Sequence, residues 1–207
     1  VKVPVTYAEA KAADDLSTAS DFRVITSSSS LTLQNMTLLG GYLASASGGA
    51  IEHIAGIGSK GNSTHLTLDH VTIADSGAKN GGALSCGTNT LTIKNSVFRN
   101  NYASQNGGAI DRSSRGLTLE DVTFTGNTAG SSGGAIHVWQ TGLTLKGDCL
   151  FENNTAGGSG GAILVNSTNN ASSLTTTAPA DGSEIIFRGN SAGAGGALWV
   201  SGPLTLN

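Results

Sequence analysis

The stretch LTIKNSVFRNNYASQNGGAI at residues 91–110 returns as LTLEDVTFTGNTAGSSGGAI at residues 117–136 and as LTLKGDCLFENNTAGGSGGAI at residues 143–163. Each copy carries three motifs in the same order: LT[LI], FxxN and GGA[IL]. A period of this length is typical of repeat proteins, in which each unit packs against its neighbours in the sequence. The repetition therefore predicts an array of stacked units.

The three motifs extend over most of the chain. LT[LI] begins at Leu31, Leu66, Leu91, Leu117, Leu143 and Leu204. GGA[IL] begins at Gly48, Gly81, Gly107, Gly133, Gly160 and Gly195, and FxxN begins at Phe98, Phe124, Phe151 and Phe187. Two copies carry polar insertions rich in Gly, Ser, Asn and Thr at residues 55–63 and 166–182, which we predict to be loops that leave the array.

The hydrophobic pattern inside one unit indicates strands. In LTL, VTF and IHV an apolar residue recurs at every second position, and Gly or Asn interrupts the pattern at short intervals. Residues 31–207 show neither the periodicity of a long helix nor the frame of a leucine-rich repeat. Such a unit buries its apolar face by stacking on the next coil, about 4.8 Å away. The prediction is an all-β fold, a right-handed parallel β-helix that is pectin-lyase-like.

Stacking would align equivalent residues in columns. One inward column consists of Leu38, Ile73, Phe98, Phe124, Phe151 and Phe187. The FxxN asparagines Asn101, Asn127, Asn154 and Asn190 follow at a turn, where we expect a left-handed backbone and amide hydrogen bonds between coils. The glycines of GGA[IL] are predicted to form a second corner, where a positive φ or a close backbone approach excludes a Cβ.

An exposed column follows LT[LI], with Gln34, Asp69, Lys94, Glu120 and Lys146 in successive copies. The charge alternates in sign from Asp69 onward, whereas like charges one strand apart would repel. We interpret this column as a salt ladder that specifies which coil follows which, with each pair contributing less than about 1 kcal/mol.

Residues 1–30 lack the repeat and are predicted to form an N-terminal cap. TYAE at residues 6–9 fits a capping box, and the alanine-rich stretch that follows predicts a short helix to about Leu16. This helix would cover the edge of the first coil. Residues 31–207 are the predicted repeat array, and because LTLN at residues 204–207 opens another copy, we expect a fragment of a longer protein.

The composition narrows the function classes. Of 207 residues, 30 are Gly and 12% are charged, and the net charge of −3 argues against nucleic acid or an anionic membrane as a partner. Cys86 and Cys149 fall in different columns about two coils apart, which is too far for a disulfide. The four histidines have no metal-ligand spacing, so we predict no metal and no cofactor.

The column after GGA[IL] is the candidate for catalysis. It runs through Glu52, Ser85, Asp111, His137, Leu164 and Trp199. Asp111 and His137 would lie one coil apart, about 5 Å, with Glu52 two coils from Asp111, and Trp199 could serve as a sugar platform. The column holds no Lys or Arg and turns apolar at Leu164. We therefore expect a solvated face and no enzyme, with a polysaccharide-degrading lyase or glycoside hydrolase as the alternative.

The paired GGA[IL] and FxxN motifs resemble those of the chlamydial polymorphic membrane proteins and of similar β-helical autotransporter passengers. FRNN at residues 98–101 with GGAI at residues 107–110 is one such pair, and the likeness covers about residues 31–207. The first two copies depart from the pattern, with Leu38 and Ile73 in place of Phe and with Gly41 and Ser76 in place of Asn. The chain also has two cysteines, whereas chlamydial members are usually rich in Cys.

The resemblance implies an extracellular passenger of the bacterial cell surface, exported through a C-terminal outer-membrane barrel beyond this stretch. It implies a virulence role as an adhesin for a host-cell surface protein or glycan, with self-association into a homo-oligomer in some members. The binding candidates carried over are Phe98, Asn101, Phe124, Asn127, Phe151, Asn154, Phe187 and Asn190, to which we add Asn166, Asn169 and Asn170 of the second loop because loops project from the corners. A third class is a passive spacer or ice-binding array, suggested by the outward threonines Thr32, Thr67, Thr92, Thr118, Thr144 and Thr205.

Overall fold

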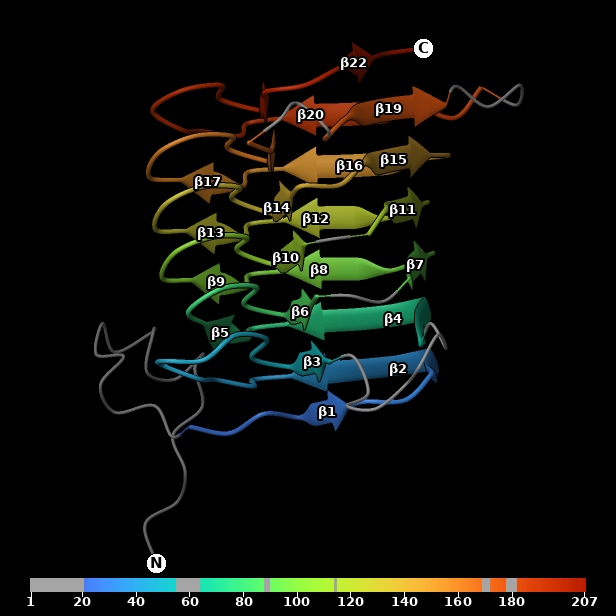
Figure 1. Cartoon of the computed structure of the whole chain (residues 1–207), viewed down its shortest axis with the longest axis vertical. Helices are drawn as coiled ribbons and strands as arrows, with labels where there is room; N and C mark the ends of the chain where they lie inside the picture. Colours follow the sequence, from blue (N-terminus) through green and yellow to red (C-terminus); the bar gives the residue numbers. More distant parts are fainter. Residues whose placement is uncertain (1–20, 55–63, 88–89, 114, 169–171, 178–181) are drawn as a thin grey trace, which may run out of the picture.

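The coils of the chain lie one above the next in sequence order in a computed structural model of the protein (Figure 1). The structure describes residues 21–54, 64–87, 90–113, 115–168, 172–177 and 182–207. Within these ranges every regular element is a strand, and every ladder between named strands is parallel. The predicted all-β array of parallel coils is confirmed. The hand of the coil and the likeness to pectin lyases stay predictions, and the predicted capping helix lies outside the described residues.

A seven-stranded sheet follows the GGA[IL] corner of each coil. Its strands, in spatial order, are β1 (Ile25–Ser27), β3 (Ile51–His53), β6 (Leu84–Cys86), β10 (Ile110–Ser113), β14 (Ile136–Trp139), β18 (Ile163–Asn166) and β21 (Leu198–Val200). The order rises by one coil at each step, as Figure 1 shows for β3 to β14. Strand β1 lies within the stretch predicted to be the cap, and it pairs with β3 as the lowest strand of this sheet.

An eleven-stranded sheet carries the LT[LI] and FxxN segments. In the first two coils one long strand spans both segments, β2 (Leu31–Leu39) and β4 (His65–Ala74). Later coils divide it in two, as β7 (Thr90–Lys94) with β8 (Val97–Arg99), β11 (Leu117–Glu120) with β12 (Thr123–Thr125), β15 (Leu143–Lys146) with β16 (Cys149–Glu152), and β19 (Leu174–Thr177) with β20 (Ile185–Arg188), before β22 (Leu204–Thr205). The division falls at Asn95, Asp121 and Gly147, which have a positive φ. The equivalent Asn35 and His70 also have a positive φ, although β2 and β4 continue through them.

A third, four-stranded sheet lies between the FxxN segment and the GGA[IL] corner. It contains β5 (Gly77–Ala78), β9 (Tyr102–Ala103), β13 (Thr128–Ala129) and β17 (Thr155–Ala156). Each of its strands carries a buried alanine at the second position, and Gly77 of β5 is buried as well.

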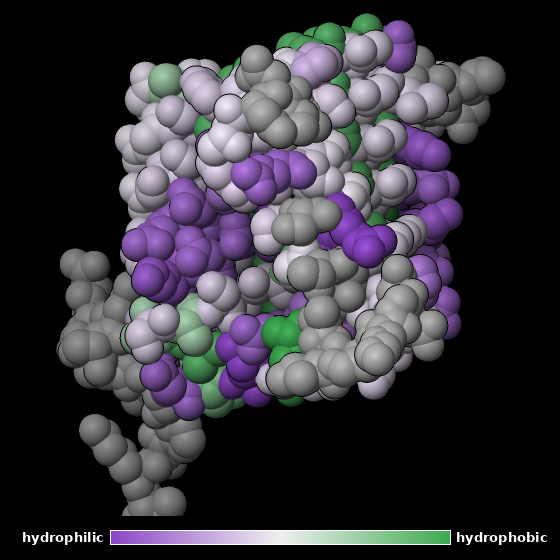
Figure 2. All heavy atoms as spheres, viewed as in Figure 1, coloured by the Kyte–Doolittle hydropathy of each residue, from purple (hydrophilic) through white to green (hydrophobic). Residues whose placement is uncertain are grey.

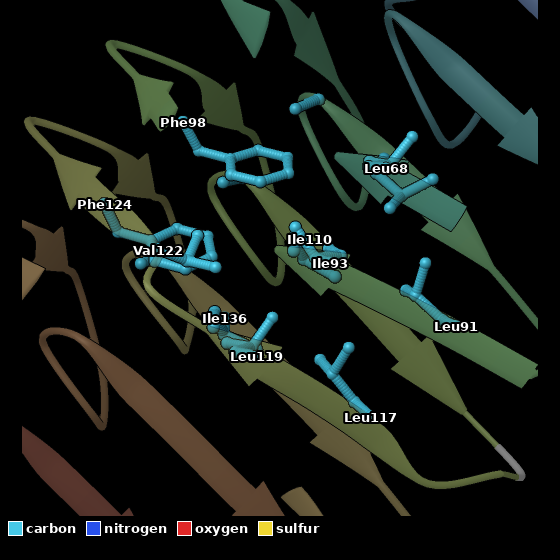
Figure 3. Packing of buried hydrophobic residues seen from close by; sticks show 14 of the residues in the cluster. Leu68, Leu91, Ile93, Phe98, Ile110, Leu117, Leu119, Val122, Phe124 and Ile136 are labelled. Atoms are coloured by element: carbon cyan, nitrogen blue, oxygen red, sulfur yellow. The ribbon is translucent and has the colours of Figure 1, made fainter. Parts of the chain in front are cut away.

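The core is a set of apolar columns enclosed by the three sheets. Figure 3 shows Leu91 beside Leu117, Ile93 beside Leu119 and Phe98 beside Phe124, each pair being register partners on neighbouring strands. Ile110 and Ile136 face them from the seven-stranded sheet. These side chains are buried, and complete burial of a side chain of this size contributes about 1.5–3 kcal/mol.

The prediction of one long loop over residues 166–182 is wrong, because this stretch contains strand β19. Leu174 is the register partner of Leu143 on one side and of Leu204 on the other. The LT[LI] pattern does not include this strand because Thr176 stands where the pattern requires Leu or Ile. Thr176 is nevertheless buried, and its hydroxyl accepts a hydrogen bond from the backbone N–H of Asn207 at 2.9 Å.

Candidate functional site

The FxxN phenylalanines form a continuous stack inside the coil. Ring centroids lie 4.9 Å apart from Phe98 to Phe124, 5.1 Å from Phe124 to Phe151 and 4.9 Å from Phe151 to Phe187, and the rings are within 10° of parallel. The first three rings are fully buried, and Phe187 is partly covered. A partner that contacts the intact surface therefore does not reach Phe98, Phe124 or Phe151.

The FxxN asparagines form a hydrogen-bonded ladder beneath the turn. The amide nitrogen of Asn101 donates to Oδ1 of Asn127 at 3.0 Å, Asn127 donates to Asn154 at 2.9 Å, and Asn154 donates to Asn190 at 3.0 Å. Each amide also donates to a backbone carbonyl of a neighbouring coil, that of Ile73 for Asn101 and that of a phenylalanine for the other three, as from Asn127 to Phe98 at 3.0 Å. The predicted amide ladder is thus present, and its three lower members are fully buried.

The prediction of a left-handed backbone at these asparagines is wrong by one residue. The positive φ falls on the preceding residue, at Asn100, Gly126, Asn153 and Gly189. That residue makes the turn at the surface, exposed at Asn100, Asn153 and Gly189 and partly exposed at Gly126, while the FxxN asparagine points its amide into the coil.

The GGA[IL] corner requires each of its glycines for a different reason. The first glycine has a positive φ in all six copies, for example 66° at Gly133. The second has no space for a side chain in the first five copies, since a Cβ on Gly134, for example, would overlap the carbonyl oxygen of Gly161 in the next coil. Both reasons given by the sequence are confirmed, and both are structural.

The charged column has the predicted register, with Asp69, Lys94, Glu120 and Lys146 on successive strands. Among the described residues it closes one ion pair, Lys94 Nζ to Glu120 Oε2 at 2.9 Å, and this contact raises the pKa of Lys94. Asp69 instead accepts a hydrogen bond from Asn95 at 2.9 Å, which lowers its pKa. Hydrophilic residues likewise lie above one another along one edge of the molecule in Figure 2.

The column after GGA[IL] lies on the outer face of the seven-stranded sheet, in the predicted order. Glu52, Ser85, Asp111, His137, Leu164 and Trp199 are register partners in turn. His137 Nδ1 lies 2.7 Å from Asp111 Oδ1, and both side chains are partly exposed. This pair could exchange a proton with a ligand at the surface.

Glu52 does not join that pair. Its carboxylate forms an ion pair with Arg23 Nη1 at 3.0 Å, and Ser85 separates it from Asp111 by one strand. Arg23 lies in the non-repeating N-terminal stretch, so the repeat pattern gave no signal for this contact. His137 is followed on the next strand by Leu164, so the column offers it no neighbouring nucleophile there.

The predicted loop residues are divided between described and undescribed positions. Residues 55–63, with Asn169 and Asn170, lie outside the described residues. Asn166 ends strand β18, beside Trp139 of β14. Its backbone carbonyl accepts a hydrogen bond from the Ser172 hydroxyl at 2.8 Å, so the chain returns toward the sheet before β19 begins.

A buried polar group was missed by the sequence analysis. His53, Cys86 and Arg112 are consecutive inward residues of the seven-stranded sheet, below Val138 and Val165. Arg112 donates to the carbonyl oxygen of Cys86 and to its Sγ, each at 2.9 Å. Burial and the nearby Arg112 charge lower the pKa of His53, whose two ring nitrogens have no hydrogen-bond partner. The alternation of inward and outward positions along β3 and β10 is the sequence signal that places His53 and Arg112 inside the coil.

Cys86 and Cys149 are both buried, and no disulfide joins them, as their predicted separation in the stack requires. Burial raises the pKa of Cys149, whose Sγ contacts the Lys146 carbonyl oxygen at 3.2 Å. Over the part of the chain that the structure describes, no group of three or more His, Cys, Asp or Glu side chains is arranged to hold a metal ion. No helix in the same residues is long and apolar enough to cross a membrane.

A surface pocket lies at the C-terminal coil. It has a volume of about 250 Å³ and is lined by Thr176, Ser183, Ile185, Phe187, Leu198, Leu206 and Asn207. Its lining residues Phe187 and Leu198 continue the inward columns of Phe151 and Ile163. Hydrophobic residues correspondingly gather near the top and bottom of the view in Figure 2.

The fold and the two motif columns together define a parallel β-helical repeat protein, whose recurring FxxN and GGA[IL] positions hold one coil on the next. Residues 95–111, 121–138, 148–166 and 184–201 each match the Chlamydia polymorphic membrane protein repeat. The chain therefore carries four repeats of the chlamydial polymorphic membrane protein family, and the suspected resemblance is confirmed. That family is associated with the outer membrane and the cell surface, which assigns the chain to the bacterial envelope. No curated protein and no solved structure gives a significant match.

Proposed function

We propose that the chain is a surface-displayed autotransporter passenger that acts as an adhesin, binding a host-cell surface protein or glycan. The observation that carries this proposal is the set of four family repeats built on a stack of paired coils. Such a stack offers long faces whose side chains are held at a fixed spacing, which suits binding over a large area. Self-association of the passenger and export through a C-terminal barrel belong to the same proposal, and nucleic acid is not a partner in it.

The buried FxxN residues serve this function by holding the frame. Asn127 links Asn101 to Asn154 through its amide, and Phe124 lies between two other rings. Residues that contact a receptor are instead sought on outer faces and at corners. Asn166 is the one predicted loop candidate that the structure describes, and it stands on an outer face at such a corner.

The proposal assigns no catalysis to Glu52, Asp111 and His137. Arg23 holds Glu52, and Leu164 occupies the position next to His137. The Asp111–His137 pair is the observation that favours the alternative of a polysaccharide-degrading enzyme. Incubation of the protein with plant, bacterial and host polysaccharides should release no new reducing ends and no unsaturated sugars; release that Asp111→Asn abolishes would establish the enzyme instead.

Binding of the fluorescently labelled protein to intact epithelial cells tests the adhesin directly. We expect saturable binding that unlabelled protein displaces and that heat-unfolded protein does not show. A variant in which a Gly-Ser turn replaces residues 168–171 keeps the sequences of β18 and β19. The difference between its cell binding and that of the wild type gives the contribution of residues 168–171 to binding. Absence of saturable binding by protein that is β-rich in circular dichroism would reject the adhesin.

A further inference from the structure

The two tryptophans of the chain lie on one surface, although they come from different coils. Trp139 belongs to β14, where it follows the buried Val138, and Trp199 belongs to β21, between the partly buried Leu198 and Val200, so both point outward from the seven-stranded sheet. The register runs from Trp139 to Asn166 and from Leu164 to Trp199, which sets the two residues two coils apart and two positions apart along the strand. Their Cα atoms are then separated by about 12 Å.

The side chains around the tryptophans combine an apolar surface with fixed polar groups. Leu164 points outward between His137 and Trp199 and yet is only 5% exposed, so its neighbours cover it. Asp111 and His137 are joined at 2.7 Å on the same face. The amide oxygen of Asn166, beside Trp139, is buried and has no hydrogen-bond partner. We call this surface the tryptophan face, and it consists of Asp111, His137, Trp139, Leu164, Asn166 and Trp199.

The chemistry of the tryptophan face matches a sugar ring. A pyranose has a flat face of C–H groups, which packs on an indole, and a rim of hydroxyls, which donate and accept hydrogen bonds. Asp111 accepts, the Asn166 amide does both, and His137 does either according to its tautomer. The six side chains include no Lys or Arg, so a phosphate or sulfate group would find no cation among them.

The outer face of the eleven-stranded sheet lacks these features. It presents threonines, such as Thr92 and Thr118, beside the charged column of Lys94 and Glu120. Because the coils and their spacing are the same on both sheets, the difference lies in the side chains alone.

We propose that the tryptophan face binds a neutral oligosaccharide of pyranose units, which stacks on Trp139 and Trp199 and hydrogen-bonds to Asp111, His137 and Asn166. The two indoles are separated by about the length of a disaccharide, so one chain of sugars spans both. This inference rests on the adhesin function proposed above and names its ligand class and its site.

Titration of the intact protein with defined neutral oligosaccharides, followed by its tryptophan fluorescence and by an immobilised glycan array, tests the proposal. The chain has two tryptophans, and both belong to the site, so a bound sugar should change the emission. We expect saturable binding of one saccharide class, weakened at least tenfold by Trp199→Ala and by Trp139→Ala. Ile186→Ala is the matched control, because Ile186 is an exposed apolar residue of the same coil as Trp199 on the other sheet, and it should leave binding unchanged.

Three results would overturn the proposal: no binding of any neutral saccharide by folded protein, binding that neither tryptophan variant weakens with no change in emission, or binding of sulfated sugars only. If the tryptophan variants do not fold, the emission change of the intact protein still decides between this face and another. Binding to cells distinguishes failure of the proposed sugar site from failure of the proposed adhesin function. Adherence that survives Trp199→Ala would reject the sugar site and keep the adhesin, whereas sugar binding without adherence would keep the site and reject the adhesin.

Discussion

The two large sheets are built by the same coils, yet their outer faces differ. On the eleven-stranded sheet the column through Thr32, Thr67, Thr92, Thr118, Thr144, Thr175 and Thr205 has the same residue on every strand. On the seven-stranded sheet the column through Glu52, Ser85, Asp111, His137, Leu164 and Trp199 changes at every strand. Residues that recur in every coil stabilise the stacking of the coils. Outward residues that differ from coil to coil are not required for stacking and can therefore bind a ligand.

The largest effect is expected at the corner glycine, where repetition is complete. Gly134→Ala forces a Cβ onto the carbonyl oxygen of Gly161 and should abolish folding or cost more than about 4 kcal/mol. Gly87→Ala is the control, because a Cβ there meets nothing within 4 Å. Urea unfolding followed by circular dichroism measures both. Equal stabilities for the two variants would break the link between repetition and stacking.

A smaller loss is expected within the asparagine ladder. Asn127→Ala leaves the backbone N–H of Asn101 and the carbonyl of Phe98 without their partner, which should cost about 2–4 kcal/mol. Asn100→Gly should be nearly neutral, since Gly126 and Gly189 occupy its column with the same positive φ. Thermal unfolding of the two variants compares them, and a larger loss for Asn100→Gly would contradict the assignment of the turn to position 100.

The buried His53, which does not recur in the later coils of its column, should make the stability of the protein depend on pH. Burial lowers the pKa of His53 below its ordinary value of 6.5, so the unfolded chain binds a proton that the folded chain does not. Above pH 6.5 neither state binds this proton and His53 has no effect on the pH dependence, whereas below pH 6.5 the free energy of unfolding falls by up to about 1.4 kcal/mol per pH unit. His53→Val places at this position the residue found at Val138 and Val165 of the same column. The free energy of unfolding of this variant, measured by chemical unfolding between pH 5 and 8, should depend less on pH than that of the wild type. An unchanged profile would show that another group titrates.

The smallest effect is expected in the charged column. Lys94 and Glu120 are each more than a third exposed, so Lys94→Gln should lower stability only slightly, and salt should reduce the difference. Unfolding at low and high ionic strength measures it. A loss as large as that of Asn127→Ala would give this outer column a share in holding the coils together.

The fold could be predicted from the sequence because each residue of a coil lies against the equivalent residue of the next coil. The column of Phe98, Phe124 and Phe151 and the order from Glu52 to Trp199 could be written from repeat positions alone. The missed features are those in which a repeat is altered or absent. Strand β19 was missed because a buried Thr176 with its own hydrogen-bond partner replaces an aliphatic residue.

The site was predicted less completely than the frame. The Asp111–His137 contact followed from the register, whereas the ion pair of Glu52 depends on Arg23, which lies outside any repeat. The inward Arg112 donates hydrogen bonds to Cys86 of the previous coil. Because this pair does not recur in the other coils, the repeat pattern gives no sign of it. The turn at Asn100 was assigned one residue late because FxxN marks the buried asparagine and not the bend.

Cell binding per folded molecule, measured side by side for Phe124→Leu and Trp199→Ala, tests the division between frame and face most directly. Phe124→Leu places in the stack a residue that its column already holds at Leu38, so it should lower stability by about 1 kcal/mol and leave binding unchanged. Trp199→Ala, at a half-exposed position, should leave stability nearly unchanged and reduce binding at least tenfold. Loss of binding with a fully folded Phe124→Leu, together with normal binding by Trp199→Ala, would contradict this division.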